Sequence, residues 1–115
     1  MSVTPKKIIP GIQIPNAVAA TPGLYVAPAN TKTIIKKLTF TNNDTVAHTV
    51  TVHLVASGGT GGVTNIITKA FPVGPGICYE AFEAEGQVLM TGDFITAFAD
   101  AASMVTCHGS GVEVV

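Results

Sequence analysis

Polar and apolar side chains alternate most regularly over residues 49–54, which read Thr-Val-Thr-Val-His-Leu. Successive side chains of a β-strand point to opposite faces, so an alternation with period two predicts a strand with one buried face. Val50, Val52 and Leu54 would share that face. His53 falls on the other face, where we expect it to contact solvent or a protein interface.

A second alternating segment covers residues 32–42. Its side chains form an apolar set and a threonine set, with Ile34, Leu38 and Phe40 on one face and Thr33, Thr39 and Thr41 on the other. Lys36 falls on the apolar face, which indicates either a β-bulge that shifts the alternation by one residue or a face that is only partly buried. The connection over residues 42–45 is rich in Asn and Asp, so the two segments are expected to form an antiparallel hairpin.

Further short strands are expected along the rest of the chain, at residues 24–27, 65–71, 77–82, 88–90, 94–99, 104–108 and 112–115. Glycine, often beside proline or an acidic residue, separates them at residues 74–76, 85–86, 91–93 and 110–111. This spacing predicts a single all-β domain over residues 23–115, an antiparallel β-sandwich or jelly roll of about eight short strands, with a small barrel as the other architecture. The order of the strands does not follow from the pattern.

The first 22 residues contain four of the seven prolines, which exclude a helix or a central strand. We expect an extended N-terminal arm over residues 1–22. Its isoleucines, Ile8, Ile9, Ile12 and Ile14, are candidate inter-subunit contacts, because a stretched arm would span about 60 Å and could reach a neighbouring subunit. The alternative is that the arm folds back as an edge strand on its own sandwich and buries these isoleucines there.

Charged residues make up only 11% of the 115 residues, against about 25% in an ordinary soluble domain. There is no arginine and the net charge is −1, so nucleic acid is not an expected partner. No apolar stretch of 18 residues is evident, so we expect no membrane insertion. No secretory segment is evident either, so we expect Cys78 and Cys107 to be free thiols. With 47% apolar residues, the chain is expected to have its surface covered by a partner, although a neutral, threonine-rich surface could also stay soluble unaided.

Residue patterns that carry chemistry give no catalytic, cofactor or metal site. The glycine-rich run at residues 57–62 lacks the Gly-Lys-Ser/Thr ending of a phosphate-binding loop and is interpreted as a hairpin loop. The histidines and cysteines lack the close spacing of a zinc site, and adjacent Cys107 and His108 would point to opposite faces of a strand. Glu80, Glu83 and Glu85 are interpreted as a solvated loop rather than as a paired acid and base. The chain is therefore not expected to be an enzyme.

The run from Leu24 to Ile35, the segments 38–42 and 50–54, the Gly92-Asp93 turn and the closing residues 110–114 together resemble small β-sandwich modules encoded in tailed-bacteriophage structural gene clusters. The resemblance implies a virion protein, first of all a capsid decoration (cement) protein that binds the major capsid protein or other virion subunits and stabilises the shell. It also implies a homo-oligomer, found in the host cytoplasm during assembly. The alternative is a tail or tail-fibre binding module that recognises a host-surface glycan.

Overall fold

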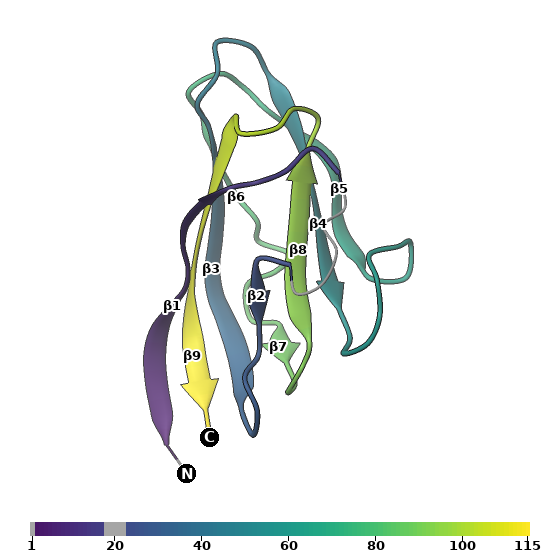
Figure 1. Cartoon of the computed structure of the whole chain (residues 1–115). Coiled ribbons are helices and arrows are strands. Elements are labelled where there is room, and N and C mark those ends of the chain that lie inside the picture. Colours follow the sequence, from purple (N-terminus) through teal and green to yellow (C-terminus); the bar gives the residue numbers. More distant parts are fainter. Residues whose placement is uncertain (1, 18–22) are drawn as a thin grey trace.

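Two antiparallel β-sheets enclose the core in the computed structural model, which describes residues 2–17 and 23–115 (Figure 1). In the described residues all secondary-structure elements are β-strands. This confirms the all-β fold and is consistent with a β-sandwich. One sheet has the order β1-β9-β3-β6, with β7 also paired to β3, and the other has the order β2-β8-β4-β5. The strands are β1 (Val3–Gln13), β2 (Tyr25–Val26), β3 (Lys32–Asn42), β4 (His48–Val55), β5 (Ile66–Val73), β6 (Cys78–Glu80), β7 (Val88–Leu89), β8 (Phe94–Ala99) and β9 (Val105–Val114).

Strand β3 contains the bulge that was one of the two interpretations of Lys36. Its register against β9 shifts between Ile35 and Lys37, so the buried face changes from odd to even positions. Thr33 and Ile35 are buried before the shift, and Leu38 and Phe40 after it. Ile34 is half-buried and lies outside this inward set. The bulge lets the two consecutive lysines at 36 and 37 stay exposed in the middle of a buried strand.

The expected hairpin between β3 and β4 is wrong, because the two strands lie in different sheets. Strand β3 pairs with β9, β6 and β7, whereas β4 pairs with β5 and β8. Both strands bury apolar side chains in the same core from opposite sides, and the turn after Asn42 carries the chain from one sheet to the other. A turn signal between two strands shows that the chain reverses; it does not show that the strands share hydrogen bonds.

The two strands expected at 104–108 and 112–115 are one continuous strand, β9, so the turn predicted at Ser110-Gly111 is also wrong. A Cβ added at Gly111 would lie 2.5 Å from the carbonyl oxygen of Ile34. A Cβ at Gly109 would lie 3.2 Å from Leu38 and 3.3 Å from Ile9. These glycines therefore allow close approach of neighbouring strands, which is the other common reason for glycine inside a strand.

The N-terminal segment forms the edge strand β1, antiparallel to β9, as the second interpretation of the arm proposed. An edge strand tolerates its prolines, Pro5 and Pro10, because one side of the strand needs no ladder partner. Beyond β1, the Ile14 amide donates to the Val105 carbonyl and the Ala99 amide donates to the Pro15 carbonyl, so the chain crosses from one sheet to the other. Residues 18–22 of the expected arm lie outside the described residues.

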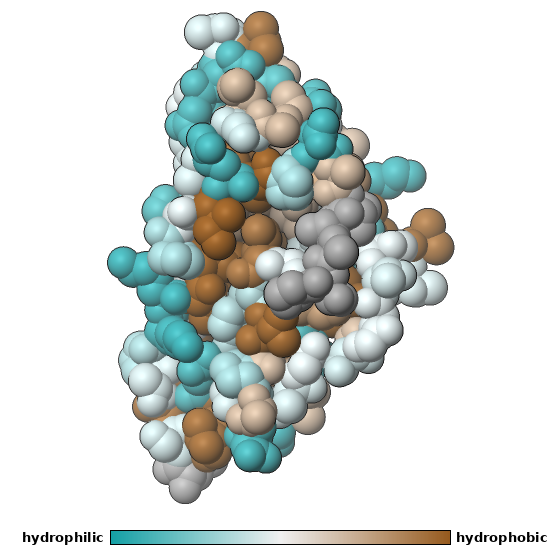
Figure 2. Space-filling view, in the orientation of Figure 1, coloured by the Kyte–Doolittle hydropathy of each residue, from teal (hydrophilic) through white to brown (hydrophobic). Residues whose placement is uncertain are grey.

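A buried tyrosine links the two sheets on each side of the sandwich. Tyr25 on β2 donates to the Glu113 carboxylate on β9 at 2.6 Å, and its hydroxyl lies 2.8 Å from that of Thr33. Burial, followed by the contact with Glu113, raises the pKa of Tyr25 to about 12. Tyr79 on β6 makes the corresponding link to Thr68 on β5, at 3.3 Å. Figure 2 shows a band of hydrophobic residues along the open side between β1/β9 and β2/β8.

Candidate functional site

Two exposed phenylalanines and an exposed isoleucine lie together at the side of the sandwich where β5 and β6 face each other. Phe82 is 68% exposed, Ile77 56% and Phe71 44%. They border a groove of about 540 Å³ whose lining residues come from β5, β6 and the loops that follow them: Phe71, Pro72, Val73, Ile77, Cys78, Tyr79, Glu80, Phe82 and Glu83. We call the exposed part of this lining, formed by Phe71, Ile77 and Phe82, the edge surface.

An aromatic stack connects the edge surface to the core. The ring of Phe71 lies 4.1 Å from that of Tyr79, with 16° between the planes, and Tyr79 lies 6.2 Å from buried Phe40. The Tyr79 hydroxyl donates to the Glu83 carboxylate at 2.6 Å. Burial and then this hydrogen bond raise the pKa of Tyr79, whereas hydrogen bonds from Tyr79 and Thr68 lower the pKa of Glu83. Tyr79 is therefore held by its hydrogen bond and by the core, and the exposed ring of Phe71 stacks on this fixed ring before any partner binds.

The three glutamates of this region have different partners. Glu83 accepts the Tyr79 hydrogen bond, and Glu80 forms an ion pair with Lys37 at 3.8 Å. Glu85 lies beside Glu80, and hydrogen bonding with Glu80 raises its pKa. All three were expected in a solvated loop, but Glu80 and Glu85 are half-buried, and only Glu83 is exposed. Glu80 and Glu83 line the groove, so they place carboxylates beside the edge surface.

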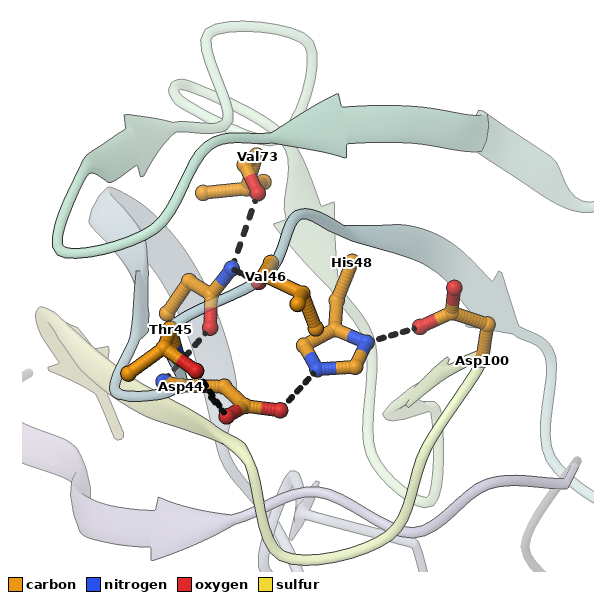
Figure 3. A network of polar contacts seen from close by, with 7 residues as sticks. Asp44, Thr45, Val46, His48, Val73 and Asp100 are labelled. Carbon is orange, nitrogen blue, oxygen red and sulfur yellow. Dashed lines mark hydrogen bonds and ion pairs between the residues drawn. The ribbon is translucent and has the colours of Figure 1, made fainter.

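His48 forms the most connected polar cluster, which joins the β3–β4 turn to the β8–β9 loop (Figure 3). Its Nε2 lies 2.7 Å from Asp44 and its Nδ1 lies 2.7 Å from Asp100. The hydrogen bond with Asp44, followed by the contacts with Asp100, raises the pKa of His48, and the same bond lowers the pKa of Asp44. Because both ring nitrogens are occupied by carboxylates, His48 has no free nitrogen to act as a general base. The cluster holds two loops together.

Asn42 supports this cluster from inside the same turn. Its side chain is fully buried, and its amide nitrogen donates to the carbonyls of Val46 and Val73, both at 2.9 Å. Its side-chain oxygen accepts the Asp44 amide at 2.9 Å. The Asn and Asp residues that suggested a hairpin turn therefore build a crossover between sheets and anchor it to the end of β5.

The candidate inter-subunit isoleucines lie largely inside the chain. Ile8, Ile9 and Ile14 are 5%, 0% and 1% exposed and belong to the core cluster, and Ile12 packs against that cluster as a partly buried residue. In this conformation the first three have almost no exposed surface to offer a neighbour. The register of β1 shifts between Lys6 and Ile9 and again before Ile12, which allows the consecutive residues 8 and 9 both to be buried.

His53 is on the face opposite Val50 and Val52, as expected, but it is only 4% exposed, so its expected contact with solvent is wrong. The glycine-rich loop folds over this face of the sheet, and Asn65 at its end forms a hydrogen bond with His53 Nδ1 at 2.9 Å.

Cys107 is buried, and burial raises the pKa of its thiol. Its neighbour His108 is exposed, which confirms that the two point to opposite faces. Both cysteines are free thiols, with Cys78 exposed.

Phe71, Ile77 and Phe82 were not among the candidate residues predicted from the sequence, although all three lie at the ends of predicted strands. A usable signal was present at residue 82, where a large aromatic side chain stands directly before the polar run Glu-Ala-Glu-Gly.

Within residues 2–17 and 23–115, no three His, Cys, Asp or Glu side chains are grouped so that they could hold a metal ion. No helix long and apolar enough to cross a membrane occurs in the same residues.

Comparison with known proteins gives no match: no family model, curated protein or solved structure is similar to this chain.

Proposed function

We propose that this chain is a structural module that is built into a larger protein assembly, specifically as a decoration protein on a bacteriophage capsid. The observation that carries the proposal is the edge surface, which exposes two phenylalanines and an isoleucine on a chain with few charges. Monomeric proteins seldom leave such a group of large apolar side chains in water unless it binds something. The capsid as the site of assembly rests on the sequence resemblance to phage β-sandwich modules.

Covering the edge surface would release enough free energy for docking, and part of the surface is already rigid. Covering what remains exposed of Phe71, Ile77 and Phe82 would contribute roughly 2.5–5 kcal/mol to association, before the cost of ordering the partners. The stack of Phe71 on Tyr79 already fixes one of the rings, so little side-chain freedom is lost there.

The proposal is tested by replacing Ile77 and Phe82 together with serine and measuring occupancy on undecorated heads of the phage that encodes this gene, by co-sedimentation. Both side chains are exposed, so the thermal midpoint should change little while occupancy falls by at least about tenfold. Val3→Ser is the matched control, because Val3 is 57% exposed, close to the 56% of Ile77, and lies on β1 at the opposite edge of the same sheet.

Equal occupancy by the wild type and the Ile77/Phe82 variant would refute docking through the edge surface. Binding of the wild type to purified tails but not to heads would refute the decoration role and support the tail-associated alternative. A wild type that binds neither particle would refute the virion proposal as a whole.

A further inference from the structure

A second hollow lies on the outer face of the β2-β8-β4-β5 sheet, beneath the glycine-rich loop, and is separate from the edge surface. Its volume is about 580 Å³, within the range of about 300–1,000 Å³ that small-molecule sites occupy. The lining residues are mostly apolar, with a few polar groups: Thr51, His53, Gly61, Gly62, Val63, Ile66, Lys69, Ala70 and Phe98. This composition is typical of a ligand pocket.

The wall of the hollow is held in place by Asn65, at the end of the glycine-rich loop. The Asn65 side-chain oxygen accepts the Gly62 amide at 2.9 Å, and its amide nitrogen donates to the Thr60 carbonyl at 2.9 Å. These two bonds fix the orientation of the Asn65 amide group, so the same oxygen must accept a hydrogen bond from the Nδ1–H of His53. The proton of a neutral His53 is therefore on Nδ1.

Phe98 is the partly exposed aromatic side chain in the lining, and the buried ring of His53 supports it. The rings of His53 and Phe98 lie 6.3 Å apart, with 21° between their planes. Neighbouring Thr51 accepts the Ala70 amide at 3.0 Å, which holds the strained backbone of Ala70, with φ of 47°, at the edge of the hollow. An aromatic ring packs favourably against another aromatic ring, such as that of Phe98, in an offset arrangement.

Among the residues that the structure describes, Lys69 is the one charged residue in the lining, which includes no carboxylate. It forms no ion pair with any carboxylate of the described residues. An anionic group bound here would therefore gain a partner without displacing an existing one. We propose that the hollow binds a small aromatic carboxylate, with its ring against Phe98 and its carboxylate paired with Lys69. This proposal goes beyond the assembly role and does not depend on it.

The test is a titration of the ¹⁵N-labelled full chain with benzoate, followed by amide chemical shifts, with benzyl alcohol as the neutral probe of similar shape. We expect saturable shifts at residues 51–53, 61–70 and 98, with a dissociation constant of roughly 1 mM or weaker for so small a ligand. Benzyl alcohol should bind about tenfold more weakly or worse, because it lacks the charge.

Lys69→Gln should reduce benzoate affinity to that of benzyl alcohol while leaving the rest of the spectrum unchanged. Lys7→Gln, an exposed lysine on β1, is the matched control and should bind benzoate like the wild type. The proposal is overturned if benzoate causes no saturable shifts, if the shifts centre on Phe82 and the edge surface, or if Lys69→Gln binds benzoate as tightly as the wild type does.

Discussion

Replacing Ile9 with alanine tests whether the N-terminal strand is part of the sandwich. Ile9 has no exposed surface, and it lies against Gly109 on β9 beside Leu38. The substitution removes three carbon groups, which corresponds to roughly 2.4 kcal/mol of lost burial. The cavity that remains adds to this loss, so we expect the free energy of unfolding to fall by about 3–4 kcal/mol, within the range measured for buried isoleucines. For a domain of this size, that lowers the thermal midpoint by roughly 10 °C or more.

The assay is thermal unfolding followed by circular dichroism, with sedimentation equilibrium on the same samples. Lys7→Ala is the control from the same strand, because Lys7 is exposed, and it should change the midpoint by little. If Ile9→Ala leaves the midpoint unchanged and instead abolishes self-association, β1 must pack on a neighbouring subunit, and the edge-strand arrangement would not be the solution structure.

Three further predictions concern pH, packing and thiol reactivity. Because the pKa of His48 is raised, its stabilising contribution is complete below about pH 6.5 and is lost as the pH rises through the higher folded-state pKa. His48→Gln should remove this part of the pH dependence of the thermal midpoint. An unchanged pH profile would contradict a stabilising role of protonated His48. Gly111→Ala should destabilise the fold by about 1–3 kcal/mol in chemical denaturation, whereas Gly62→Ala, whose Cβ would meet nothing within 4 Å, should have little effect. Cys78 should react with a thiol reagent in the native protein and Cys107 only after unfolding, so a native count of two or a denatured count of zero would be evidence against this structure.

The sequence predicted local features accurately where they depend on neighbouring residues. The strands at residues 32–42 and 94–99 have the bounds that the structure shows, because alternation and flanking turns are local properties. A bulge near Lys36 was one of the two interpretations offered. It is required because two consecutive lysines cannot both be exposed in a regular strand with one buried face. The candidate site was not predicted: exposure of Phe71 and Phe82 depends on β5 and β6 being edge strands, and no local pattern carries that information.

The sequence by itself determined the all-β class, most of the strand positions and the low surface charge. Tertiary structure alone decided which strands pair, because pairing satisfies backbone groups between segments far apart in the chain, as with β1 and β9 at its two ends. It also decided that Ile9 is buried in its own core and that His53 is covered by a loop. Alternation specifies that a strand has two different faces, but the elements packed on each face determine whether a side chain meets water, core or partner.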